Sequence, residues 1–396
     1  MVVAPNPFPV PQAEIDRLHA RLDDTRWPDV PSGAGWSYGV PPDHLRELAD
    51  HWRHRFDWRA VEERLAADSV VVDTPDHAGV HALYRRSTRS DAVPLLLVHG
   101  WPSTPADFLD LLGPLTEPGD AALPAFHVVA PSLPGFGFSG PTRDLGWDVD
   151  RHARCLADLM SALGHERFLA QGGDFGSMIA PEIARRDPGR VLGVHVNALV
   201  GAFPDVTADD PLAGLDDAGR ARVAELDLTW AERSGYAAIQ GTRPSTAGYA
   251  MTDSPVGLLA WHREWFVDYD PDTTGQTPVE PDAYLADVAS FWFTRTAGSA
   301  MRLYKEVPAS SFCETRPPSG VPTAVLNLLG DHGVRVFAER SHRVVRWTEH
   351  DRGGHFASLQ APDLLLDDLR AFAHSLGPDS GDRPVPQGGR VTGEQR

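Results

Sequence analysis

From Val70 onward the chain alternates short apolar runs with amphipathic stretches, and this rhythm limits the folds that it can adopt. Such short apolar runs are typical of strands that are buried on both faces of a sheet. Strands that alternate with helices pair in parallel, because each helix carries the chain back to the same edge of the sheet. We therefore predict an α/β fold with a mostly parallel central sheet. Its first strands are expected at residues 95–98, 126–129, 168–170 and 191–194.

The rhythm stops between residues 201 and 317, where helical patterns that contain Trp and Tyr are broken by Pro and Gly. We interpret this segment as a helical cap inserted into the α/β core. The rhythm then resumes, with strands expected at 321–329 and 344–348 and helices at 334–342 and 362–376.

The first seventy residues contain helical patterns, at 12–22 and 44–65, and no strand signal. They are interpreted as a separate segment that precedes the core. The predicted organisation is a leading domain at 1–75, a core in two parts at 76–200 and 318–377, the cap at 201–317, and a disordered Gly- and Pro-rich tail at 378–396.

Charge and composition argue against several kinds of partner. The 396 residues include 55 acidic and 36 basic side chains, and no basic run could neutralise a phosphate backbone or an anionic membrane surface. We expect neither nucleic acid nor a membrane as a partner. With two cysteines, no signal-peptide pattern and no long apolar run, the chain is expected to be cytoplasmic and free of structural disulfides. The sequence leaves a homo-oligomer open.

The string Gly172-Gly173-Asp174-Phe175-Gly176 lies between a predicted strand and a helix, and it predicts a nucleophile elbow. Such a turn strains its central residue, so the flanking positions must be small. The central residue is an Asp, and the chain contains no Gly-x-Ser-x-Gly string, which disfavours an esterase or lipase. Taken alone, the string could also be a loop with an N-capping Asp.

A carboxylate nucleophile suits attack on a tetrahedral carbon that bears a leaving group, because the resulting ester can be hydrolysed in a second step. Epoxides and alkyl halides are substrates of this kind. His99-Gly100-Trp101-Pro102 directly follows a predicted strand, where this fold presents a backbone amide to an oxyanion. We expect the amides of Trp101 and Phe175 to form the oxyanion hole, and His99 to be a packed structural residue.

His355 follows two glycines in a loop before the last helix, and we expect it to reach the elbow and act as a base. The chain order of nucleophile, acid and histidine calls for a carboxylate at a strand end between Asp174 and His355. Asp331 fits this position. Glu349 and Asp351 share the strand or loop that leads to His355, from which orienting its ring is difficult.

Other patterns indicate neither a cofactor nor a metal. Residues 135–140 have the glycine spacing of a dinucleotide-binding loop, but Pro134 and Pro141 bracket them and no helix opens at the third glycine. None of the 17 histidines shows a zinc-binding spacing. We expect no cofactor and no metal.

Together, the elbow, the motif at 99–102, the segment at 131–139 and the loop at 352–356 resemble the microsomal-type epoxide hydrolases. The resemblance runs from about residue 8 to residue 376. It includes residues 24–28, Asp-Thr-Arg-Trp-Pro, which are similar to the signature of that family's leading domain. It implies the α/β-hydrolase fold, with a helical cap and an N-terminal segment that wraps around the core. Because no N-terminal hydrophobic anchor is seen, the chain is expected to be a soluble bacterial relative.

This family holds the epoxide oxygen with two cap tyrosines, and matching strings assign that role to Tyr236 and Tyr304. Without the resemblance, either tyrosine could equally be a core residue of the cap. Two positions depart from common family patterns. Phe175 stands where many relatives and the haloalkane dehalogenases have a Trp, and Asp331 stands where some members have Glu.

The resemblance implies hydrolysis of a small-molecule epoxide to a vicinal diol. Asp174 would form an alkyl-enzyme ester, and His355, oriented by Asp331, would activate water against it. The alternatives are a haloalkane dehalogenase and a non-catalytic binding protein on the same scaffold. Phe175 counts against the first, because it has no indole N–H for a departing halide. The cap aromatics suggest a bulky apolar or aromatic epoxide, although ordinary packing explains them equally well.

Overall fold

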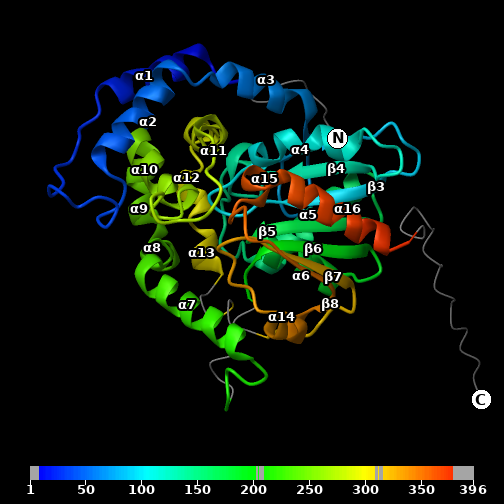
Figure 1. The fold of residues 1–396 in the computed structure, drawn as a ribbon. Coiled ribbons are helices and arrows are strands. Elements are labelled where there is room, and N and C mark those ends of the chain that lie inside the picture. Colours follow the sequence, from blue (N-terminus) through cyan, green and yellow to red (C-terminus); the bar gives the residue numbers. More distant parts are fainter. Residues whose placement is uncertain (1–8, 202–203, 205–208, 308–310, 312–314, 378–396) are drawn as a thin grey trace, which may run out of the picture.

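The short apolar segments form one sheet at the centre of the molecule (Figure 1). The structure is a computed structural model that describes residues 9–201, 204, 209–307, 311 and 315–377. The tail predicted at 378–396 lies outside the described residues. The sheet has eight strands in the order β1-β2-β4-β3-β5-β6-β7-β8. Their bounds are β1 Ser69–Val72, β2 Val80–Arg85, β3 Val93–Val98, β4 Phe126–Pro131, β5 Phe168–Asp174, β6 Val191–Leu199, β7 Pro322–Asn327 and β8 Arg343–Glu349.

Most strand pairs of the sheet are parallel, which confirms the predicted architecture. All neighbours from β4 to β8 pair in parallel, whereas β2 is antiparallel to both β1 and β4. The sequence prediction contained no antiparallel pair. The seven residues between β1 and β2 are too few for a crossover helix, so these two strands must form a hairpin.

Helices cover both faces of the sheet. The crossover from β3 to β4 runs along the sheet in the opposite direction to those from β4 to β5 and from β5 to β6, so right-handed connections place their helices on opposite faces. Accordingly, α4 packs with α16, and α5 packs with α6. The core helices are η1 Pro105–Phe108, α4 Leu109–Thr116, η2 Gly137–Ser139, α5 Val149–Ala162, α6 Gly176–Arg186, α14 Arg335–Ser341, α15 Ala357–Gln360 and α16 Pro362–Ser375.

Between β6 and β7 the chain leaves the sheet and forms the helical cap, as the fold prediction requires. Its helices lie beside the sheet and below the N-terminal segment in Figure 1. They are α7 Asp217–Arg233, α8 Gly235–Thr242, α9 Pro244–Asp253, α10 Pro255–Phe266, α11 Pro281–Thr294, α12 Ala297–Ala300 and α13 Leu303–Glu306. The predicted domain boundaries stay predictions.

Three N-terminal helices, α1 Gln12–Asp23, α2 Pro42–His54 and α3 Trp58–Asp68, arch over the cap and one edge of the core (Figure 1). His51 Nε2 lies 2.6 Å from Asp282 Oδ1 of α11. The single helix predicted at 44–65 is wrong. Asp57 begins a new helix there, because its carboxylate accepts hydrogen bonds from the N–H groups of Arg59 and Ala60.

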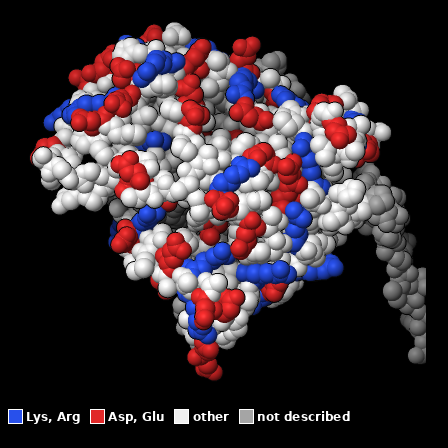
Figure 2. All heavy atoms as spheres, in the orientation of Figure 1, with Lys and Arg blue, Asp and Glu red and all other residues white. Residues whose placement is uncertain are grey.

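The surface carries both signs of charge. Figure 2 shows acidic and basic side chains interspersed on one face of the molecule, without a continuous basic patch on that face. Within the described ranges, no helix is both long enough and apolar enough to cross a bilayer.

Candidate active site

Asp174 lies at the carboxyl end of β5, in a turn that leads directly into α6. Its backbone is in the left-handed region, with φ at 55°, which is strained for a residue other than glycine. Other backbone segments lie very close to this turn on both sides. A Cβ atom at Gly172 would overlap the carbonyl of Gly176, and one at Gly176 would overlap the carbonyl of Val98. The two glycines therefore allow the turn that the sequence string predicted.

The loop after β3 reaches Asp174 through its backbone. The N–H of Trp101 donates a hydrogen bond to Asp174 Oδ1 at 2.9 Å. Gly100 makes this approach possible, because a Cβ atom there would overlap the Asp174 carboxylate. Phe175, the other expected oxyanion donor, stands at the N-terminal end of α6, where backbone N–H groups point out of the helix.

His355 faces the other carboxylate oxygen of Asp174. Its Nε2 lies 3.5 Å from Asp174 Oδ2. The backbone N–H of His355 donates to Gln276 Oε1 of the cap at 3.3 Å, which holds the loop in place. Burial alone would lower the pKa of His355, but the Asp174 carboxylate and, more weakly, Asp331 outweigh it and raise the pKa. In the free site, these charges favour an imidazolium paired with Asp174.

Asp331 lies beyond the end of β7, where its Oδ2 accepts a hydrogen bond from the Leu328 N–H at 2.9 Å. Burial raises its pKa to about 6, against the opposing effects of that hydrogen bond and of the charge on His355. The two side chains interact through charge, and no hydrogen bond joins them in the part of the chain that the structure describes.

Glu349, the acidic residue at the end of β8, is paired with a different side chain. Glu349 accepts a hydrogen bond from Arg222 at 2.9 Å. That hydrogen bond lowers the pKa of Glu349 to about 2.

The cap places Tyr236 of α8 and Tyr304 of α13 beside each other, with ring centroids 5.5 Å apart. Trp101 stacks on Tyr236 at 5.4 Å, and Phe175 meets Tyr304 edge-on at 4.8 Å. Burial, reinforced by the negative charge of Asp174, raises the pKa of both phenols well above the usual value for tyrosine. Both tyrosines are therefore hydrogen-bond donors at neutral pH. The structure brings together the two tyrosines that only the resemblance had singled out.

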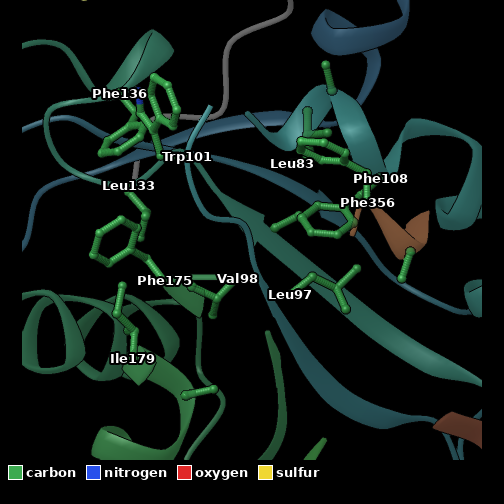
Figure 3. Packing of buried hydrophobic residues seen from close by; sticks show 14 of the residues in the cluster. Leu83, Leu97, Val98, Trp101, Phe108, Leu133, Phe136, Phe175, Ile179 and Phe356 are labelled. Atoms are coloured by element: carbon green, nitrogen blue, oxygen red, sulfur yellow. The ribbon is translucent and has the colours of Figure 1, made fainter. Parts of the chain in front are cut away.

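A cavity of about 40 Å³ adjoins Asp174. Its apolar walls include Phe108 and Phe356, which lie beside each other in Figure 3. Its polar walls include Ser103, Asp107, Gln171, Asp174, Asn197 and His355.

Sequence reasoning missed Asp107 of η1 and Asp287 of α11, which form a buried pair of carboxyls near the site. One pattern in the sequence could have revealed Asp287. Asp287 stands inside an otherwise apolar helical run, Leu285-Ala286-Asp287-Val288-Ala289, where an acidic residue needs a partner.

The structure gives His99 and the glycine-rich residues 135–140 structural roles. His99 is buried, and its Nε2 accepts a hydrogen bond from the Leu133 N–H at 3.1 Å. The glycine-rich residues 135–140 form a turn with the short helix η2. Among the residues described, no group of three or more His, Cys, Asp or Glu side chains could hold a metal ion.

A strained nucleophile turn after a central parallel strand, a backbone amide on its oxygen and a facing histidine define an α/β-hydrolase, here with Asp in the nucleophile position. Comparison with family models agrees. The model for the α/β hydrolase fold matches residues 93–360, and the model for the epoxide hydrolase N terminus matches residues 3–108. The chain belongs to the epoxide hydrolase family.

Individual relatives match nearly the whole chain. A protein of Stigmatella aurantiaca, provisionally named an epoxide hydrolase, is 36% identical across 94% of this chain and 85% of its own length. Epoxide hydrolase 1 of Sus scrofa is 30% identical across 91% of this chain and 86% of its own. The structure of Aspergillus niger epoxide hydrolase matches with a TM-score of 0.81 at 27% identity, covering 95% of this chain and 97% of that one. The resemblance to microsomal-type epoxide hydrolases is confirmed.

Proposed function

We propose that the chain hydrolyses a small-molecule epoxide to a vicinal diol through an ester on Asp174. One observation carries the proposal. The Asp174 carboxylate, held at an elbow, interacts with two protonated cap phenols and with His355. Family membership supports the reaction, and the geometry suggests the role of each residue.

In the first step, an oxygen of Asp174 attacks an epoxide carbon, and the carbon–oxygen bond of the ring breaks. The ring oxygen becomes an alkoxide and takes a proton from Tyr236 or Tyr304. Two phenols can share the developing charge, which lowers the barrier at neutral pH. The products of this step are a hydroxyalkyl ester of Asp174 and one tyrosinate.

The second step is hydrolysis of the ester. Once Asp174 is esterified it has no negative charge, so the main influence that raises the pKa of His355 is lost. Burial then favours the neutral imidazole, so His355 gives its proton to the tyrosinate, directly or through water, and can take a proton from the hydrolytic water. Water attacks the ester carbon, and the oxyanion is stabilised by the amides of Trp101 and Phe175. The diol leaves, and the proton of the Asp174 carboxyl passes to His355, which restores the starting ion pair.

The substrate is proposed to be bulky and apolar or aromatic. The two tyrosines are surrounded by rings, because Trp265 contacts Tyr236 at 4.7 Å and Trp101 contacts Tyr304 at 5.5 Å. We also propose a cytoplasmic location, since two cysteines are too few for a disulfide scaffold.

The test uses purified protein with styrene oxide and, separately, a 1-bromoalkane of similar length. We expect phenylethanediol from the epoxide and no bromide from the haloalkane. Asp174→Asn should abolish diol formation at unchanged thermal stability. Bromide release without diol would identify a dehalogenase instead, and binding of styrene oxide without turnover would identify a binding protein.

A further inference from the structure

Two buried carboxyls join the cap to the loop that supplies the oxyanion amide. Asp107 of η1 and Asp287 of α11 are 5% and 0% exposed. Asp287 Oδ1 accepts hydrogen bonds from the N–H and the hydroxyl of Thr104, at 2.7 and 2.6 Å. Thr104 lies three residues after Trp101, so these bonds fix the cap helix against that loop.

The two carboxyls share one proton. They are hydrogen-bonded to each other, and two carboxyl oxygens can face each other in this way only when one of them is protonated. Asp107 Oδ1 and Asp287 Oδ2 are buried, and no N–H or O–H group among the described residues donates to them. Burial and the charge of Asp107 raise the pKa of Asp287 well above its usual value. Burial raises the pKa of Asp107 as well, so the pair carries one proton and one negative charge between its two members.

Asp107 also lines the cavity beside Asp174 and His355, whereas neither tyrosine does. The cavity volume of about 40 Å³ exceeds the roughly 10–15 Å³ that one water needs. Gln171 Oε1, also on its wall, is buried and without a partner in the described part of the chain. The cavity thus combines a base, a carboxylate and the carbon that water must attack.

We propose that Asp107 binds the hydrolytic water, accepting one of its hydrogens while His355 accepts the other. This inference rests on the function proposed above. A single hydrogen bond to His355 would leave the water free to turn, whereas two acceptors aim its oxygen at the ester carbon. Asp107 is a stronger acceptor than the neutral Gln171, because it belongs to a pair that carries a negative charge.

In ester hydrolysis, Asp107 accepts a hydrogen bond but neither gains nor loses a proton. The water oxygen forms a bond to Cγ of Asp174, and one proton passes to His355 Nε2. The second hydrogen stays covalently bound to that oxygen and forms a hydrogen bond to Asp107, and it leaves as the proton of the Asp174 carboxyl. The bond between Cγ and the diol oxygen then breaks, and His355 returns its proton to the diol.

The pair offers a matched set of variants. Asp107→Asn removes the carboxyl oxygen that would bind water and replaces it with an amide of the same shape. Asp287→Asn is the control, because its amide N–H can donate to Asp107 as the shared proton does, and its Oδ1 can still accept from Thr104. Asp107→Glu restores a carboxylate at the same position.

The experiment is a single turnover of the full-length enzyme, in excess over styrene oxide, with mass spectrometry of the Asp174 peptide. Asp107→Asn should form the ester at a rate within about threefold of the parent and hydrolyse it at least about tenfold more slowly, so the ester accumulates. Asp287→Asn should match the parent in both steps. Asp107→Glu should recover part of the hydrolysis rate.

Ester hydrolysis at the parent rate in folded Asp107→Asn would contradict the proposal and leave the ester mechanism intact. An equal slowing of both steps, or failure of both Asp107 variants to fold by circular dichroism, would show that Asp107 is structural and would also contradict it. A separate outcome concerns the mechanism itself. If no ester forms even in His355→Gln, the function proposed for Asp174 fails, and this inference fails with it.

Discussion

At the scale of single residues, the site depends on groups whose protonation is set by their neighbours. Asp174 could be recognised from sequence because its flanking glycines are a local requirement of the turn. Tyr236 and Tyr304 could not, since a tyrosine on a cap helix has the same pattern whether it faces a substrate or packs in a core. Asp107 and Asp287 were missed because their pairing spans 180 residues and exists only in the folded chain.

The cap tyrosines are predicted to act as a pair in ester formation. Tyr236→Phe or Tyr304→Phe should each slow alkylation of Asp174, by about 10²-fold or more for a positioned acid, and the double variant should lose more than either single one. Stopped-flow tryptophan fluorescence under single-turnover conditions measures this rate. Unchanged rates in both single variants would remove the tyrosines from the mechanism.

The pKa of His355 is predicted to fall during the reaction. In the free enzyme the Asp174 carboxylate raises it, and esterification removes that carboxylate while Asp331 and the burial remain. As the pH is lowered, the rate of ester hydrolysis should therefore fall only below the pKa that NMR measures for His355 in the free enzyme. His355→Gln should accumulate the ester at every pH. Equal pKa values of His355 in the free enzyme and in the ester would contradict the proposed change in charge.

At the scale of elements, the strands and the cap followed from apolar patterning, because burial on both faces leaves a clear local signal. The break at Asp57 was overlooked, although a capping Asp before Trp58 was visible in the sequence. The hairpin of β1 and β2 was also missed, since strand direction depends on the length of the connection rather than on the strands themselves.

The N-terminal helices are predicted to stabilise the cap through Trp58. This residue is 4% exposed and meets Phe293 of α11 at a centroid distance of 4.8 Å. Trp58→Ala should lower the free energy of unfolding by about 3–5 kcal/mol and expose the cap to proteolysis. Tyr38→Ala, at a residue 74% exposed in the same segment, is the control and should change stability by less than about 0.5 kcal/mol. Equal effects of the two changes would contradict this role.

At the scale of the whole molecule, several histidines are buried in the neutral form. Burial lowers the pKa of His81 and His262 to about 3 and that of His99 to about 4. The unfolded chain binds protons at these sites below pH of about 6.5, so the stability that each contributes is present above that value and is lost as the pH falls toward 3. Asp331, whose pKa is raised to about 6, acts in the opposite direction.

This linkage is tested most simply at His262, which is 2% exposed. Between pH 7 and pH 5, His262→Phe and His262→Gln should each lose about 2 kcal/mol less stability than the parent, because neither replacement titrates. Urea unfolding at both pH values measures the difference. The two variants differ in packing, which is independent of pH, so a disagreement between them in the pH effect would contradict the titration of His262.

The central claim is that Asp174 is a nucleophile and not a base that activates water. A single turnover in ¹⁸O-water with excess enzyme and styrene oxide separates the two. If the ester forms, water attacks Cγ of Asp174, so the heavy oxygen must appear in the Asp174 peptide and be absent from the first diol. A first diol that carries ¹⁸O, with an unlabelled Asp174 peptide, would contradict the account.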